Sequence, residues 1–109
     1  MLTIAETQHF ERQWPKYWNE AEYDSFIEFI AENPGAGDVV PHSGGVRKIR
    51  WSRSGSGKSG GVRVVYFVRN SVGQIVLLTI YAKATTANMT AAELKELRRV
   101  YEKIATSQR

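Results

Sequence analysis

The sequence predicts one small α+β domain, residues 1–109, with helices packed on one face of a mostly antiparallel sheet. A chain of 109 residues is long enough to bury one hydrophobic core and too short for a second. Its hydrophobic content of 42% is typical of a folded protein. Apolar spacing along the chain indicates a strand, two helices, three strands and a last helix, and this order defines the fold class.

The N-terminal third of the chain predicts a short strand and two helices. Residues 2–4 fit a strand, and Thr7 is a suitable side-chain cap for a short helix that Pro15 interrupts. Asn19 and Glu22 form the capping box of a second helix. Apolar side chains follow at helical spacing, namely Tyr23, Phe26, Ile27 and Ile30. An Asn-Pro-Gly sequence then ends this helix.

A loop rich in glycine and proline, residues 35–45, precedes three strand-like runs. These runs are residues 46–51, 61–68 and 74–81, and a turn at residues 70–73 joins the last two into a hairpin. The unbroken apolar centre of the third run indicates a strand that is covered on both faces. A Gly/Ser loop with two cations connects the first run to the second.

The C-terminal segment predicts a helix that begins at a second capping box. Thr90 and Glu93 have the spacing of that box. Apolar side chains then fall on one face of the helix, namely Leu94, Leu97, Tyr101 and Ile104.

Charge is distributed unevenly along the chain. The net charge is +4, but residues 1–38 hold eight acids, the last of them Asp38, and only two bases. Residues 39–92 hold eight bases and no acid. A stretch of this kind creates a local positive field that attracts polyanions such as nucleic acids.

Several chemistries are excluded or disfavoured. The absence of cysteine excludes disulfides and thiolate chemistry. His9 and His42 lack metal-ligand spacing with a carboxylate, so we expect no metal and no cofactor. A phosphate-loop spacing is absent around Gly55–Ser59. No signal-peptide pattern is present, and no apolar run is long enough for a bilayer, so we expect a cytoplasmic protein without membrane contact.

Four cations are expected to converge at one part of the sheet. Lys48 and Arg50 point to the same face of an extended strand, and pairing can bring Arg63 to that face. Lys83 follows the end of the third strand. Aromatic residues that can stack on bases, but that also fit the core, lie among them: Trp51, Tyr66, Phe67 and Tyr81. Since no acid is interleaved with these cations along the chain, we expect nucleic-acid binding.

Three sequence pieces, in this order and spacing, resemble the RelE superfamily of toxins, and within it the HigB-like branch. The pieces are GGVRKIR at 44–50, GVRVVYF at 61–67 and LLTIYAK at 77–83, with the basic Gly/Ser loop between the first two. The resemblance spans residues 23–104. It implies the toxin of a toxin–antitoxin system, which enters the ribosomal A site and cleaves mRNA without a metal.

The resemblance also implies roles for individual residues. Lys48 and Arg50 match the family's basic strand pair, and Lys48 is the leading candidate for the base that takes the 2′-hydroxyl proton, because neighbouring cations favour the loss of a lysine proton. Arg63 is expected to stabilise the phosphate. Lys83 lies where the family often has a Lys-Arg pair, but Ala84 replaces a further arginine, so the acid is either Lys83 or a cation of the Gly/Ser loop. The other central cations are expected to dock ribosomal RNA: Arg47, Arg53, Lys58 and Arg69.

The implied partners are the ribosome, mRNA and a cognate antitoxin. Such antitoxins are small, commonly contain a helix-turn-helix domain, and are expected to cover the basic face. Two other functions stay open at this point: a toxin of the same fold directed at DNA gyrase, as in the ParE group, and a non-catalytic RNA-binding or ribosome-binding module. The set Lys48, Arg50 and Arg63 favours RNA cleavage, whereas fold alone does not separate the three.

Overall fold

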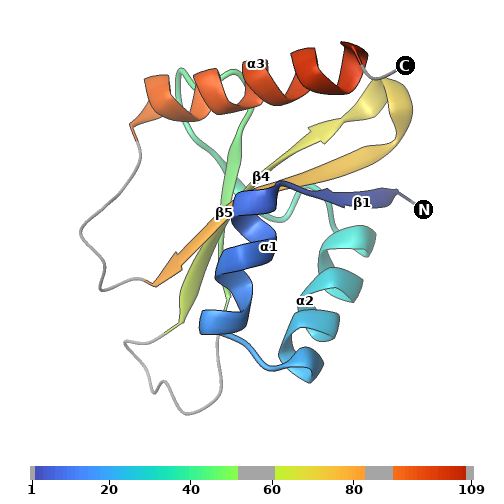
Figure 1. Cartoon of the computed structure of the whole chain (residues 1–109), viewed down its shortest axis with the longest axis vertical. Helices are drawn as coiled ribbons and strands as arrows, with labels where there is room; N and C mark the ends of the chain where they lie inside the picture. The colour runs from blue at the N-terminus through green and yellow to red at the C-terminus, as the bar shows by residue number, and fades with distance from the viewer. Residues whose placement is uncertain (1, 52–60, 83–89, 108–109) are drawn as a thin grey trace.

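Five strands form one sheet in the order β1-β5-β4-β3-β2 (Figure 1). The computed structural model describes residues 2–51, 61–82 and 90–107. The elements are β1 (Thr3–Glu6), α1 (Gln8–Gln13), the 3-10 helix η1 (Trp14–Lys16), α2 (Glu20–Glu32), β2 (Asp38–Val39), β3 (Arg47–Trp51), β4 (Val62–Arg69), the 3-10 helix η2 (Asn70–Val72), β5 (Gln74–Ala82) and α3 (Ala91–Ser107). Strand β1 pairs with β5 in parallel and the other pairs are antiparallel, so the predicted mostly antiparallel α+β fold is confirmed.

The helices cover both faces of the sheet, whereas the sequence predicts them on one face. Helices α1 and α2 lie on one side, and α3 lies on the other (Figure 1). The reason is that consecutive residues of β4 are apolar and point in opposite directions. Val64 packs towards α1 and α2, and Val65 packs towards α3. The unbroken apolar centre of β5 signalled this cover on both faces, and that prediction is confirmed.

The two faces build two cores of unequal size. The larger core joins α1 and α2 to the sheet, and its buried members among the described residues are Phe10, Trp18, Phe26, Ile30, Val62, Val64, Tyr66, Ile75, Leu77 and Ile80. The smaller core lies under α3 and contains Val46, Val65, Phe67, Val76, Leu78 and Leu94. Because α3 packs over this smaller core, part of that sheet face has no helix of the described residues above it.

A β-bulge in β5 sets which side chains reach that uncovered part. Val65 pairs with Thr79, but the next residue of β4, Tyr66, pairs with Leu77, so Leu78 is the extra residue. The bulge allows Leu77 and Ile80, three residues apart, both to enter the larger core. It also places Tyr81 opposite Arg63.

The predicted helix starts are confirmed. The Thr7 hydroxyl accepts a hydrogen bond from the Phe10 amide, and Asn19 and Glu22 form a reciprocal capping box. Thr90 and Glu93 form the corresponding pair at α3. Within the described ranges, no helix combines the length and apolar character needed to cross a membrane.

Candidate functional site

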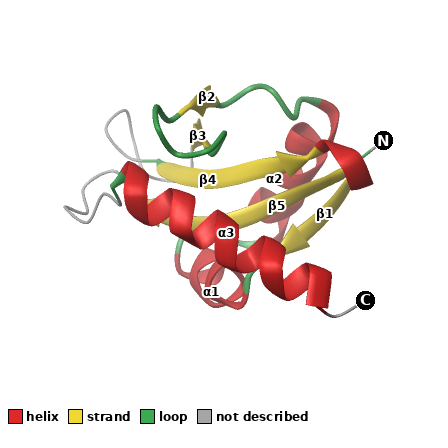
Figure 2. Cartoon of the chain, turned by 90° about the horizontal axis from the view of Figure 1, so that it is seen from above, coloured by secondary structure: helices red, strands yellow, loops and turns green. Residues whose placement is uncertain are grey.

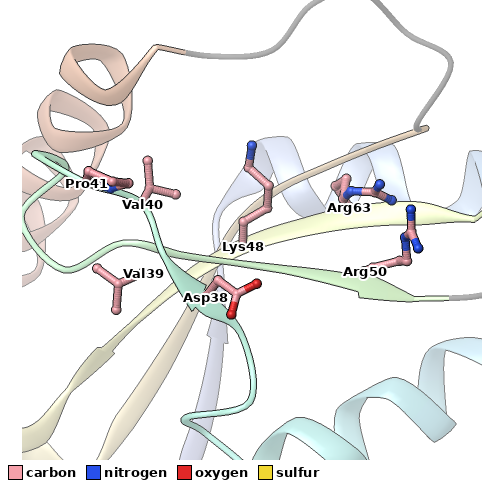
Figure 3. Close-up of a pocket in the computed structure, with 7 residues that line it drawn as sticks. All are labelled: Asp38, Val39, Val40, Pro41, Lys48, Arg50 and Arg63. Carbon is pink, nitrogen blue, oxygen red and sulfur yellow. The ribbon is translucent and has the colours of Figure 1, made fainter.

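Three cations project from β3 and β4 on the same side of the sheet (Figure 3). Arg50 pairs directly with Arg63, and Lys48 lies two residues before Arg50 on β3, so all three share one face. The alternate residues of β3, Ile49 and Trp51, pack against the larger core on the opposite face. Because the alternate residues of β3 enter this core, the cations lie on the opposite face of the sheet, in the part that α3 does not cover.

These cations line an open depression of about 530 Å³. The rest of its lining comes from β2 and the residues after it: Asp38, Val39, Val40 and Pro41 (Figure 3). Arg50 is exposed, whereas Lys48 and Arg63 are half-buried at its floor. The depression is open to solvent and is not an enclosed cavity.

The Arg63 guanidinium has an unsatisfied nitrogen. Its Nη1 is buried and finds no hydrogen-bond partner within the described part of the chain. A buried donor without a partner destabilises a fold by about 1–3 kcal/mol, and by more when the group is charged. An anionic ligand in the depression can satisfy this nitrogen, and a phosphate suits the planar, multidentate guanidinium.

The depression also contains a carboxylate, although the central stretch of the sequence that supplies the cations has no acid. Asp38 pairs with Lys48 across β2 and β3, so its side chain lies on the cationic face. No acid lies between the cations in the sequence. In the folded protein, however, an acid lies beside them, so the expectation of a site without acids is wrong. Asp38 is exposed, and no hydrogen bond or ion pair joins its carboxylate to another described residue.

A buried tyrosine holds the segment that carries Asp38. The Tyr66 hydroxyl accepts a hydrogen bond from the Gly37 amide at 2.9 Å and donates one to the Pro34 carbonyl at 2.8 Å. A Cβ atom at Gly37 would lie 2.8 Å from the Tyr66 hydroxyl oxygen, so only glycine allows this close approach. Burial raises the pKa of Tyr66, which keeps the hydroxyl protonated as a donor.

Arg47 lies on the opposite face from Lys48 and supports the same segment. Its Nη1 donates to the Gly37 carbonyl at 2.7 Å and to the Gly35 carbonyl at 3.3 Å. The structure thus gives Arg47 a structural contact, and its expected role in docking ribosomal RNA stays a prediction. Together, Arg47 and Tyr66 hold the segment before β2, which keeps β2 beside β3 although β2 has only two residues.

Of the other predicted site residues that the structure describes, neither Arg47 nor Arg69 joins this cluster. Arg69 lies at the other end of β4, where its Nη1 donates to Gln74 Oε1 at 3.0 Å. Six residues of strand separate it from Arg63, which corresponds to about 20 Å. Arg53, Lys58, Lys83 and Ala84 lie outside the described residues. Of the four predicted catalytic residues, the structure therefore brings Lys48, Arg50 and Arg63 together.

Most of the predicted stacking aromatics belong to the core. Trp51 packs against Phe26 and Phe29, and Tyr66 and Phe67 are fully buried. Tyr81 is half-buried and pairs with Arg63, so it is the member of this set that lies beside the cations. Within the described ranges, no three His, Asp or Glu residues are grouped closely enough to bind a metal ion.

Sequence reasoning missed Asp38 as a site residue. A strand of two residues has no periodicity to detect, and Asp38 was assigned to the acidic N-terminal block. The available signal was its position, because it is the last acid before the 54-residue acid-free stretch. Only the pairing of β2 with β3 shows that it faces the cations.

The fold and site define a small α+β protein with an open, cationic sheet face suited to a phosphodiester. Residues 6–109 match the family described as the RelE toxin of the RelE/RelB toxin–antitoxin system. The chain therefore belongs to the RelE toxin family, which confirms the resemblance at superfamily level. The narrower likeness to the HigB-like branch stays a prediction.

Solved structures of E. coli proteins share this fold. The intact RelBE toxin–antitoxin complex has a chain that is 17% identical, with a TM-score of 0.55, covering 73% of this chain and 94% of that one. A double arginine-to-alanine mutant of RelE in the free state is also 17% identical, with a TM-score of 0.55 and coverage of 94% and 96%. The isolated RelE toxin is 15% identical, with a TM-score of 0.53 and coverage of 92% and 99%.

Proposed function

We propose that this protein is a ribosome-dependent mRNA endonuclease that inhibits translation. The observation that carries the proposal is the open depression in which Lys48, Arg50 and Arg63 converge, with a buried Arg63 nitrogen that lacks a partner among the described residues. Membership of the RelE toxin family supports the same reading. The proposed reaction needs no metal ion, because the attacking nucleophile is a hydroxyl group of the RNA itself.

In the proposed reaction, the 2′-hydroxyl of one nucleotide attacks the adjacent phosphate and the 5′-oxygen of the next nucleotide leaves. The phosphate gains negative charge as the new bond forms. Arg50 and Arg63 face each other across β3 and β4, so one phosphate can contact both guanidinium groups. Fixed cations aimed at charge that develops in the transition state contribute about 100-fold to 1000-fold each in known enzymes.

The proposed partners are the ribosome, its mRNA and a cognate antitoxin with a helix-turn-helix domain, all in the cytoplasm. The RelBE complex supports an antitoxin partner, because a chain of that toxin–antitoxin complex has this fold. We propose that the antitoxin covers the depression, since acidic side chains on the partner would be attracted to the Lys48, Arg50 and Arg63 face. Lys83 and the basic Gly/Ser loop stay candidates for further RNA contacts.

The test is a translating extract supplied with a reporter mRNA, in which the 5′ ends of cleaved fragments are mapped. We expect cuts inside translated codons and none in the same mRNA without ribosomes. The double variant R50A/R63A should cut at least about 100-fold more slowly. The matched control R12A/K16A removes two exposed cations from α1 and η1 and should cut like the wild type.

Three results would overturn the proposal. Intact mRNA on translating ribosomes, with a folded protein, excludes the nuclease. Accumulation of broken DNA in cells, without RNA cuts, favours the gyrase-directed alternative. Binding to ribosomes that halts translation without cleavage favours the non-catalytic module.

A further inference from the structure

A carboxylate is unexpected in a depression that only has to bind phosphates. Asp38 carries a negative charge that repels an RNA backbone. The three cations that line the same depression attract that backbone. Neutralisation of the cations does not account for it, because the described residues show no ion pair between Asp38 and any of them. Its carboxylate is therefore available for contact with a ligand.

The position of Asp38 is fixed by the sheet. Directly opposite residues of an antiparallel pair have Cβ atoms about 4.5–5.5 Å apart, which places the Asp38 and Lys48 side chains side by side. Lys48 and Arg50 are two residues apart on one strand, a separation of about 7 Å. The depression thus has a half built from Asp38 and Lys48 and a half built from Arg50 and Arg63.

These halves differ in what they can do chemically. An arginine stays protonated in proteins, so Arg50 and Arg63 can stabilise negative charge but cannot exchange protons. A carboxylate and an ammonium group can each take part in proton transfer at neutral pH. All four residues line one depression, so a phosphate held by the two arginines lies beside the half built from Asp38 and Lys48.

We propose that Asp38 is the general base of the reaction and that Lys48 is its general acid, an inference that rests on the proposed function. The Asp38 carboxylate accepts the proton of the 2′-hydroxyl as the bond between the 2′-oxygen and phosphorus forms. The bond from phosphorus to the 5′-oxygen breaks, and the Lys48 ammonium group gives that oxygen a proton. The products are a 2′,3′-cyclic phosphate and a 5′-hydroxyl.

Asp38 and Lys48 can also return each other to the protonation states in which the reaction begins. After the reaction Asp38 holds one proton more and Lys48 one proton fewer, so one proton passed from Asp38 to Lys48 completes the cycle. The two residues are paired across β2 and β3 and both line the open depression, so water there can carry this proton. This assignment supplies the proton donor that the sequence alone left open.

The test separates binding from chemistry in the variant D38N. Single-turnover cleavage of mRNA on programmed ribosomes gives the chemical rate, and a separate titration of the ribosomes gives the affinity. We expect D38N to bind as tightly as the wild type or more tightly, because a repulsive charge is removed. Its rate should fall by at least about 100-fold, the smaller end of the range for a general base. D38E should regain part of the rate.

A matched variant completes the design. The control D24N removes an exposed aspartate of α2 and should leave both rate and affinity unchanged. Since Asp38 is exposed, D38N should keep the wild-type melting temperature.

The outcomes are distinguishable from those of the proposed function. If the wild type cuts and D38N cuts within about threefold of it, the role of Asp38 is refuted and the nuclease stands. The same holds if D38N is slower only because it binds more weakly. If the wild type does not cut at all, the nuclease and the role of Asp38 are refuted together.

Discussion

Replacing Tyr66 by phenylalanine tests how the segment that carries Asp38 is held. The variant removes one oxygen atom, which accepts from the Gly37 amide and donates to the Pro34 carbonyl. Tyr66 and Gly37 are both buried, so the Gly37 amide is left without a partner, at a cost of about 1–3 kcal/mol. The Pro34 carbonyl is partly exposed and can bind water, so its loss adds little.

We therefore expect Y66F to lower the free energy of unfolding by about 2 kcal/mol. For a chain of 109 residues this corresponds to a decrease in melting temperature of about 10 °C. The assay is urea denaturation followed by tryptophan fluorescence, with the melting temperature measured in parallel. If the proposed function holds, mRNA cleavage should also decrease while ribosome binding is retained, because β2 is less firmly held and the cations are unchanged.

The matched control is Y101F. Tyr101 packs edge-on against Phe67 and its hydroxyl makes no hydrogen bond with another described residue, so its loss should change stability by less than about 0.5 kcal/mol. A Y66F variant as stable as Y101F would refute the argument that the Tyr66 hydroxyl anchors residues 34–37.

Two further predictions concern stability. Replacing Arg63 by methionine should raise the free energy of unfolding by about 1 kcal/mol in denaturation experiments, because the variant removes a buried nitrogen that lacks a partner in the described residues. The same variant should abolish cleavage. A loss of stability would contradict the prediction. Burial raises the pKa of Glu6 above its ordinary value of 4.5, although a hydrogen bond from Tyr23 opposes the shift. The folded state then holds more protons just above pH 4.5, so this group makes stability fall as pH rises through that window, and E6Q should remove this contribution to the slope in urea titrations from pH 4 to 7.

Local signals in the sequence predict most of the secondary structure. Capping boxes at Asn19 and Thr90 mark real helix starts, and the apolar runs mark β3, β4 and β5. Each of these signals depends on residues within one turn or one strand. The placement of α3 on its own face was harder to predict, because it depends on which of the two apolar faces of β4 and β5 each helix covers.

The site was predictable only in part, for the same reason. Lys48 and Arg50 share a face by strand alternation alone, and pairing of adjacent strands adds Arg63. Asp38 joins them through a strand of two residues that Tyr66 and Arg47 hold from the far side of the sheet. No local pattern encodes contacts that join residues so far apart in the sequence.

The acid-free central stretch thus predicts polyanion binding but says little about the chemistry of the site. Arginines concentrated in such a stretch can hold a phosphate, yet they cannot move a proton. The proposed reaction uses a titratable group beside the arginines, and the central stretch offers only lysine for this role at the site. The sheet order places β2 next to β3, so the last residue of the acidic block reaches the site without interrupting the basic stretch. The charge pattern along the chain and the proposed proton transfer are therefore compatible, because the acid belongs to a different segment of the sequence from the cations it faces.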